Sequence, residues 1–325
     1  MKKIIGIGNA LVDVIVNIPD EKLLHTYSLP KGGMEMIDIE KKRNLHKAIG
    51  NMRQTLASGG STSNTIHGIA RLGGYAGYIG KVGTDAMGEF FEKDIQKSGI
   101  HAHLIHTKDL DTGIATTLMT SDAERTFATY LGAASEMNTQ EIDNEILKQY
   151  DCVQVEGYLI FNKDLTLKIC QMAKANNMLI SMDMASYNLV NDNREFIEKL
   201  LQDYVDIIFA NEEEAKAFTG KDGEEALDIL SKYCPVAVVK MGGQGSLANI
   251  HGEKVHIGTN GRKPIDTNGA GDAYAAGFLF GYLNGLSPQK TVKLAARLGD
   301  EMVATVGAKL TDNQWETILN EKDLF

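Results

Sequence analysis

Apolar and polar positions follow a helical period in several segments after about residue 60. Ser61 or Thr62 can cap a helix that ends near Gly73, and Asp85 can cap another that ends near Gly99. Ser, Thr and Asp are favoured at helix N-termini and glycine just past C-termini. These segments therefore predict helices that begin at a polar cap and end at a glycine.

Short apolar runs lie between the helical segments and predict buried strands. These runs cover residues 152–155, 178–182, 205–209 and 236–239. A buried strand followed by a crossover helix, repeated along the chain, is typical of a parallel sheet covered on both faces. We expect an α/β fold with a doubly wound, mainly parallel sheet and helices on both faces.

Two segments depart from this order, at about residues 11–39 and 101–130. In the first, Val12, Val14 and Val16 alternate with Asp13 and Ile15. Alternation with a period of two predicts strands with one exposed face. We expect a single domain over residues 1–325, with these segments forming a small β lid inserted in it.

Composition and charge exclude several classes of protein. The formal net charge is −10 and no block of like charges stands out, so the sequence predicts no nucleic-acid partner. No apolar run reaches the length of about 18 residues that a membrane span needs, so no membrane partner is expected either. Cys152, Cys170 and Cys234 are far apart, as in reduced proteins, and predict a cytoplasmic location.

The segment from Asp266 to Asp272 carries the chemistry that the pattern suggests. It reads Asp-Thr-Asn-Gly-Ala-Gly-Asp and leads into the apolar helical stretch 273–283. A glycine-containing turn at a helix N-terminus presents free N–H groups and a positive dipole end to an anion. Asp272 could then accept the proton of a hydroxyl group that attacks a phosphoryl group, and the dipole would keep it ionised.

Other interpretations of single motifs remain open at this stage. A glycine turn capped by aspartate needs no ligand, and Gly80-Lys81 lacks the remainder of a Walker A motif. The opening Gly6-x-Gly8 could indicate a nicotinamide-dependent dehydrogenase, but Leu11 stands where that motif has its third glycine. His101, His103 and His106 could suggest a metal site, although a strand would point His106 away from the other two.

Two ordered motifs resemble the signatures of one family. The run DTNGAGD at 266–272 is similar to the second signature of the ribokinase-like, or phosphofructokinase B, family of sugar and nucleoside kinases. The run SGGSTSN at 58–64 is similar to its first signature, and GIGNALVD at 6–13 extends the likeness toward the N-terminus. The resemblance implies an ATP-dependent phosphotransferase with an alcohol group as acceptor.

The resemblance also implies roles for individual residues. Asp272 would be the general base, and the backbone N–H groups of Gly269, Ala270 and Gly271 would form the anion hole. The acceptor's hydroxyl groups would be held by four residues of the N-terminal part: Asp13, Gly59, Gly60 and Asn64. Asn9 occupies the position that it has in adenosine-kinase-like members. Without the resemblance, Asp13 and Asn64 would be ordinary solvated residues.

Nucleotide and metal contacts are implied by two further motifs. Asn211 and Glu214 match an N-x-x-E motif linked to Mg²⁺ and phosphate through water, although an acidic first helical turn would look the same. Lys240, Gly242 and Gly245 match the nucleotide-binding turn, where many members carry Thr or Ser in place of the lysine. That turn could equally be a plain hairpin, because residues 246–250 read as a strand.

The lid segment contributes one further candidate. Arg125 lies in a Glu-Arg-Thr stretch similar to that of adenosine-kinase-like relatives, which implies a contact with the transferred phosphoryl group.

We expect a sugar or ribonucleoside acceptor with adenosine-like acceptors favoured, ATP and Mg²⁺ as cofactors, and a monomer or homodimer. A monovalent cation such as K⁺ can accompany this site in the family. The alternatives are a kinase for a free sugar such as ribose or fructose, and a catalytically silent binding protein.

Overall fold

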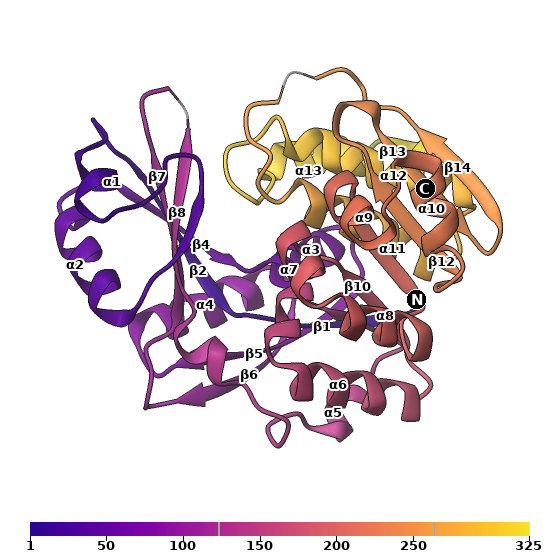
Figure 1. Cartoon of the computed structure of the whole chain (residues 1–325), viewed down its shortest axis with the longest axis horizontal. Coiled ribbons are helices and arrows are strands. Elements are labelled where there is room, and N and C mark those ends of the chain that lie inside the picture. Colours follow the sequence, from indigo (N-terminus) through magenta and orange to yellow (C-terminus); the bar gives the residue numbers. More distant parts are fainter. Residues whose placement is uncertain (123, 263) are drawn as a thin grey trace.

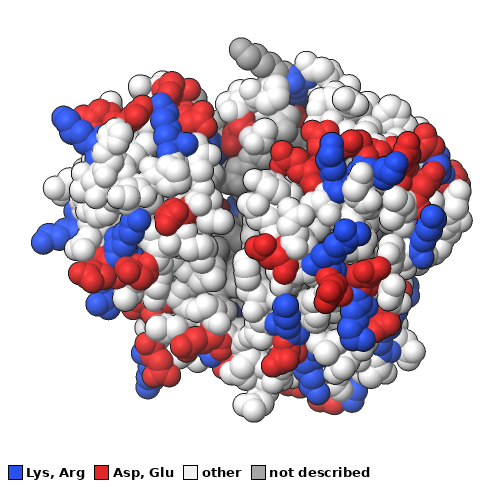
Figure 2. Space-filling model, viewed as in Figure 1, with Lys and Arg blue, Asp and Glu red and all other residues white. Residues whose placement is uncertain are grey.

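The computed structural model describes residues 1–122, 124–262 and 264–325. Two sheets divide these residues into a larger body and a smaller lid, which lie side by side in Figure 1. A groove runs between the two parts on the face shown in Figure 2, where acidic and basic side chains are interspersed. Residue 123 of the expected lid segment lies outside the described residues.

The body contains a sheet in the order β14-β13-β12-β11-β10-β9-β1-β5-β6. Its strands are β1 (Lys3–Ile7), β5 (Tyr75–Gly83), β6 (His101–Thr107), β9 (Cys152–Val155), β10 (Leu179–Asp183), β11 (Ile207–Asn211), β12 (Val236–Lys240), β13 (Ser246–Ile250) and β14 (Glu253–Ile257). The strands from β12 to β6 pair in parallel, and only the pairs β12–β13 and β13–β14 are antiparallel among the described residues. The predicted mainly parallel sheet is confirmed.

Helices cover both faces of this sheet because its strands are apolar on both faces. In β1, Ile4 joins one buried cluster with α3, α4, α11 and α12, whereas Ile5 and Ile7 join a second cluster with α6, α8, α9 and α10. The helices are α1 (Lys22–Thr26), α2 (Ile39–Ile49), α3 (Ser61–Arg71), α4 (Ala86–Lys97), α5 (Asn144–Leu147), α6 (Lys163–Ala175), α7 (Tyr187–Asp192), α8 (Arg194–Asp203), α9 (Glu212–Thr219), α10 (Gly223–Leu230), α11 (Ala270–Leu283), α12 (Pro288–Met302) and α13 (Asp312–Leu319). The fold is doubly wound, as expected.

The lid is a second sheet in the order β3-β8-β7-β2-β4. Its strands are β2 (Leu11–Asn17), β3 (Met34–Met36), β4 (Gln54–Gly59), β7 (Gly113–Met119) and β8 (Arg125–Tyr130). One face, with Val12, Val14 and Val16, is buried in the hydrophobic core that includes α2 and α4. The opposite face, with Asp13 and Ile15, turns toward the body, because a Cβ at Gly307 would lie 3.6 Å from Ile15 Cδ1.

The expected lid boundaries need two corrections. Residues 101–107 form β6, which pairs in parallel with β5 at the edge of the body sheet. Their half-exposed pattern comes from this edge position and not from membership of the lid. Conversely, β4 lies outside both expected segments yet pairs with β2 in the lid.

Most predicted local features appear at or near their expected places. The four buried strands correspond to β9, β10, β11 and β12, and Asp85 caps α4 by accepting a hydrogen bond from the Gly88 N–H. The predicted cap of α3 is wrong. Gly60 occupies the N-cap without a side-chain bond, so the Ser61 hydroxyl is free for another contact.

The described helices include none that is long and apolar enough to cross a membrane.

Candidate active site

Asp272 lies in the first turn of α11 and faces the first turn of α3. Ser61 Oγ donates a hydrogen bond to its Oδ1 over 2.7 Å, and Asn64 Nδ2 donates to its Oδ2 over 3.0 Å. The two signature motifs therefore meet at one carboxylate, although about 200 residues separate them. Ser61 belongs to the first motif but was not among the predicted site residues.

The apolar sequence of α11 explains this meeting. Residues 273–281 are all buried, so the helix has no solvent face and packs between α3 and α12. Gly68 of α3 permits a close approach, because a Cβ there would lie only 2.6 Å from the Ala276 Cβ. A helix that is apolar on all sides must lie in the core. Its first turn is thereby held against α3.

The environment of Asp272 suits a base near neutral pH. Burial raises the pKa of Asp272 to about 6, and the hydrogen bonds from Asn64 and Ser61 act in the opposite direction. Burial penalises the charged form, whereas donors to the carboxylate favour it. Burial is therefore the largest influence on its ionisation, and it opposes the effect expected of the helix dipole.

The backbone beside Asp272 has the form of an anion site. Gly269 is the N-cap of α11 with φ 72°, a left-handed conformation that favours glycine, and a Cβ there would lie 2.7 Å from the Ala308 Cβ. Ala270 and Gly271 follow in the first turn, where N–H groups lack partners within the helix. A Cβ at Gly271 would lie 3.1 Å from Lys240 Nζ, so an ammonium group stands beside this turn.

Asp13, Gly59 and Gly60 lie together where β2 and β4 meet. A Cβ at Gly59 would lie 2.2 Å from Asp13 Oδ1, and one at Gly60, where φ is 92°, would lie 2.2 Å from the Asn9 carbonyl oxygen. Burial raises the pKa of Asp13 to about 7; the charge of Lys309 lowers it and that of Asp272 raises it. The glycines are thus required for the close approach of these acceptor-site candidates.

Asn9 is held by Glu156, a residue that the sequence analysis missed. Asn9 Nδ2 donates to Glu156 Oε1 over 2.6 Å, and the Thr62 N–H donates to Oε2 over 3.2 Å. Glu156 is 3% exposed, and burial raises its pKa to about 7 despite these bonds. Its position directly after a predicted strand was the only sequence signal for it.

Lys240 lies at the end of β12 in an ionic cluster. Its Nζ is 2.8 Å from Asp183 Oδ2. Burial disfavours the charged ammonium, but Asp183 and Glu214 outweigh it and raise the pKa of Lys240. Asp183 is a second residue that sequence reasoning missed. Lys240 therefore carries a positive charge beside the first turn of α11.

Asn211 and Glu214 form a capping box at the start of α9. The Asn211 side chain accepts from the Glu214 N–H over 2.9 Å, and Glu214 Oε2 accepts from the Asn211 N–H over 2.7 Å. This is the structural alternative that the acidic first turn allowed. Burial raises the pKa of Glu214, and the charge of Asp183 adds to that effect.

Gly242 and Gly245 lie in the turn that joins β12 to the antiparallel strand β13, so the hairpin alternative is what the structure contains. Gly245 has φ 91°, and a Cβ there would lie 2.0 Å from the Ile257 carbonyl oxygen. The turn lies at the carboxyl end of β12, where α/β sheets bind ligands.

Arg125 of the lid forms an ion pair with Asp266 of the body, and their side chains are only 10% and 3% exposed. Asp266 Oδ2 also accepts from the Gly307 N–H over 2.7 Å, and its Oδ1 accepts from the Asn268 N–H over 3.0 Å. The predicted catalytic arginine is therefore close to the signature segment and is neutralised by its first residue.

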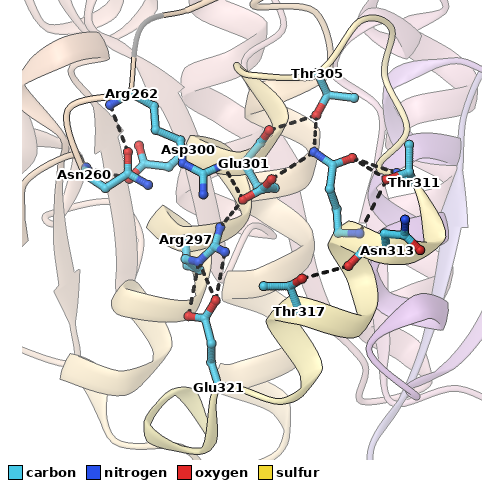
Figure 3. Close-up of polar contacts among 11 residues, drawn as sticks. Asn260, Arg262, Arg297, Asp300, Glu301, Thr305, Thr311, Asn313, Thr317 and Glu321 are labelled. Carbon is cyan, nitrogen blue, oxygen red and sulfur yellow. Dashed lines mark hydrogen bonds and ion pairs between the residues drawn. The ribbon is translucent and has the colours of Figure 1, made fainter.

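The segment between β14 and α11 is anchored to the end of α12. The Asn260 N–H donates to Asp300 Oδ2 over 2.8 Å, and Arg262 Nη1 donates to Glu301 Oε2 over 2.6 Å. Figure 3 shows that Glu301 also accepts from Arg297, so one buried carboxylate joins both arginines. These bonds hold residues 260 and 262 against the end of α12, ahead of the candidate anion site.

Within the described ranges, no group of three or more His, Cys, Asp or Glu side chains is placed to hold a metal ion. His103 instead shares a hydrogen bond of 2.9 Å with the Tyr150 hydroxyl.

Comparison with known proteins gives consistent results. The model of the pfkB family carbohydrate kinases matches residues 32–315. The crystal structure of adenosine kinase from Sinorhizobium meliloti is 32% identical, with a TM-score of 0.86 over 97% of this chain and 98% of that chain. A probable sugar kinase from Rhizobium etli is 31% identical, with a TM-score of 0.87 and 97% of each chain covered. A 5-dehydro-2-deoxygluconokinase of Clostridium beijerinckii is 31% identical over 76% of this chain and 78% of its own length.

Proposed function

The chain belongs to the pfkB family of carbohydrate kinases, and we propose that it transfers the γ-phosphoryl group of ATP to the hydroxymethyl group of a ribonucleoside such as adenosine. The observation that carries this proposal is the Asp272 carboxylate, held by Ser61 and Asn64 at the N-terminus of α11. A base and an anion site within one helical turn are what in-line phosphoryl transfer requires.

Each step of the reaction has a residue on this chain. Asp13 and Asn64 hold the acceptor's hydroxyl groups, since a carboxylate accepts two hydrogen bonds and an amide can donate or accept. Asp272 removes the proton of the attacking hydroxyl group while the oxygen of that hydroxyl group forms a bond to the γ-phosphorus. The bond from phosphorus to the bridging oxygen breaks, and ADP leaves. The N–H groups of residues 269–271 and the Lys240 ammonium balance the charge that develops on the phosphoryl oxygens.

The groups that would hold the nucleotide and its metal fit this chemistry. Lys240, Gly242 and Gly245 lie at the carboxyl end of β12, where triphosphate can approach the first turn of α11. Both oxygens of Glu214 already accept hydrogen bonds from Asn211, at 2.7 Å each, so these two residues would reach Mg²⁺ through water. Mg²⁺ retains several waters in such sites and neutralises phosphate charge.

Arg125 would add a second positive charge beside the transferred group if it exchanged its ion pair with Asp266 for the phosphoryl oxygens. A monovalent cation such as K⁺ would lie near Asp266 and Asn268. Both a monomer and a homodimer remain compatible with this mechanism, because each catalytic candidate comes from the same chain.

The body-facing surface of the lid favours a nucleoside over a free sugar. Phe127 lies on the same face as Ile15 and Arg125, and Met34 pairs beside Phe127 at the lid edge. Met34 is 50% exposed. An aromatic ring and flexible thioether are suited to contact with a planar base, whereas a free sugar would leave this apolar surface uncovered.

A free sugar such as ribose or fructose is the second candidate acceptor. The similarity to a 5-dehydro-2-deoxygluconokinase and a probable sugar kinase supports it. The two candidates share the base and anion site and differ only in what contacts the lid.

The test is ADP formation from ATP with a panel of adenosine, other nucleosides, ribose and fructose. We expect adenosine to give a kcat/KM at least about tenfold above that of either free sugar, because burying a base adds several apolar contacts. Phosphorylation of ribose or fructose without phosphorylation of any nucleoside would favour the second candidate. Reduction of NAD by a hydroxy acid without ADP formation would overturn the kinase proposal, and binding without turnover would indicate a silent binder.

A further inference from the structure

Lys309 extends from the segment between α12 and α13 into the base of the lid. Its Nζ donates a hydrogen bond of 2.5 Å to Ser58 Oγ and one of 2.7 Å to Asp94 Oδ2. Asp94 Oδ2 also accepts from the Ser58 N–H over 2.9 Å. One lysine thus joins the C-terminal segment, strand β4 and helix α4.

Ser58 connects this ionic group to the candidate acceptor site. Ser58 lies opposite Val12 in the β2–β4 ladder. The next residue, Gly59, packs against the Asp13 carboxylate so closely that a Cβ there would lie 2.2 Å from Asp13 Oδ1. A shift of β4 at Ser58 would therefore move Gly59 relative to Asp13.

The charges around Asp13 come from several elements. Asp272 of α11 adds a negative charge, and Lys309 supplies the opposing positive charge. His67 of α3 also faces Lys309, but burial, with help from Lys309 and Arg71, lowers its pKa to about 3, so it is neutral. Burial opposes the ionisation of Asp94, yet Lys309 and Ser58 lower its pKa to about 2.

We propose that Lys309 is a positioning residue for acceptor binding: it holds the Ser58–Gly59 strand against Asp13 and balances the negative charge of the Asp13 carboxylate. The inference rests on the proposed function, because it takes Asp13 to be the group that accepts hydrogen bonds from the acceptor's hydroxyls. Lys309 itself donates to Ser58 and Asp94, so it acts through Asp13 and not by contact with the substrate.

The alternative is a purely structural tie, and the sign of a pH shift separates the two. Removing the positive charge with Lys309→Met raises the pKa of Asp13. Asp94→Asn removes the carboxylate that pairs with Lys309 over 2.7 Å, leaves the Lys309 charge unneutralised, and should therefore lower the pKa of Asp13. A structural tie predicts weaker acceptor binding in both variants and no opposite shifts.

The experiment is the pH dependence of kcat/KM for the acceptor in the full chain. For Lys309→Met we expect an acceptor KM raised about tenfold at pH 7 and an acid limb moved up by about one pH unit, the size of shift that a nearby charge produces. For Asp94→Asn we expect the acid limb to move down. Lys309→Arg should recover most of the acceptor KM, and the KM for ATP should stay within about twofold in all three.

Asp272 also titrates in this range, so its contribution must be separated. Its pKa responds to Asp183 and Lys240, and its protonation lowers kcat, whereas protonation of Asp13 raises the acceptor KM. If Lys309→Met does not fold, the downward shift in Asp94→Asn and an acceptor KM in Lys309→Arg close to that of the wild type still test the inference.

Acid limbs that stay in place, or that move in the same direction in Lys309→Met and Asp94→Asn, would overturn the role of Lys309 while wild-type turnover left the proposed function intact. A wild-type chain that forms no ADP with any acceptor, and binds none by calorimetry, would overturn both.

Discussion

The Asn64 amide on α3 donates to the Asp272 carboxylate on α11 over 3.0 Å, across 208 residues of sequence. With Ser61 on the other oxygen, this contact fixes the orientation of the candidate base before any substrate binds. Hydrogen bonds to a charged group contribute about 1.5–3 kcal/mol each. The pair of donors therefore fixes the position of Asp272 and lowers its proton affinity, against the larger opposing effect of burial.

Ser61→Ala and Asn64→Ala should shift the pH dependence of kcat. The pKa of Asp272 is about 6, and the reaction needs the ionised form, so kcat falls as the pH drops through this value. Loss of either donor raises the pKa further, and we expect the acid limb to move up by about one pH unit. Ser63→Ala is the matched control on the same helix, because Ser63 Oγ has no hydrogen-bond partner in the described part of the chain. An equal shift in that control would contradict the assignment.

The sequence predicted this site through residues that share a short motif. Gly269, Gly271 and Asp272 lie within four residues of the chain, and Gly59, Gly60 and Asn64 lie within six, so each local pattern was visible. Lys309, Glu156, Asp183 and Asp94 are brought in by the tertiary fold from positions without a motif. No local pattern could reveal them, because their partners lie far away in sequence.

The fold was predictable for a similar reason. Buried parallel strands such as β9 and β12 have continuous apolar runs, and these can be recognised in the sequence. β6 and β4 lack such runs, because both lie at a sheet edge and are partly exposed. A partly exposed pattern does not indicate which sheet the strand joins. The cap of α3 was misassigned because Ser61, a good N-cap residue by type, instead bonds Asp272.

Gly60→Ala should be more damaging than a change at another left-handed glycine. Gly60 and Gly73 have φ of 92° and 86°, but a Cβ at Gly60 would lie 2.2 Å from the Asn9 carbonyl, whereas Gly73 has nothing within 4 Å. We expect Gly73→Ala to cost about 1 kcal/mol of unfolding free energy through backbone strain alone. Gly60→Ala should cost at least about 2 kcal/mol more and raise the acceptor KM. Urea unfolding checks both; equal losses would argue against a tight fit at Asn9.

Lys240→Met should destabilise the protein, and Asp183→Asn should partly restore it. The single change leaves the Asp183 carboxylate without its ion-pair partner; because the two side chains are 17% and 18% exposed, the cost should fall below the about 3–5 kcal/mol of a fully buried pair. The double variant removes the unpaired charge, so its unfolding free energy should exceed that of Lys240→Met. Both variants should show a raised KM for ATP. A double variant less stable than the single one would show that the two side chains do not form an energetic pair.

Arg125→Gln should loosen the lid. The variant removes the buried ion pair with Asp266 that links β8 to the body, and we expect faster amide exchange in β7 and β8 together with a fall of at least about 100-fold in kcat. Lys31→Gln is the control, because Lys31 pairs with Glu21 and Asp122 on the exposed side of the lid. Exposed pairs contribute about 0–1 kcal/mol. Equal exchange in the two variants would mean that the Arg125 pair does not hold the lid.

The most direct measurement is the rate of ADP formation with adenosine and ATP, comparing the native chain with Asp272→Asn. Asparagine retains the size of the side chain and one acceptor oxygen but cannot take a proton. If Asp272 is the general base, kcat should fall about 10²- to 10⁴-fold while the KM for ATP changes by less than about threefold. A kcat within about twofold of the native value would contradict the account.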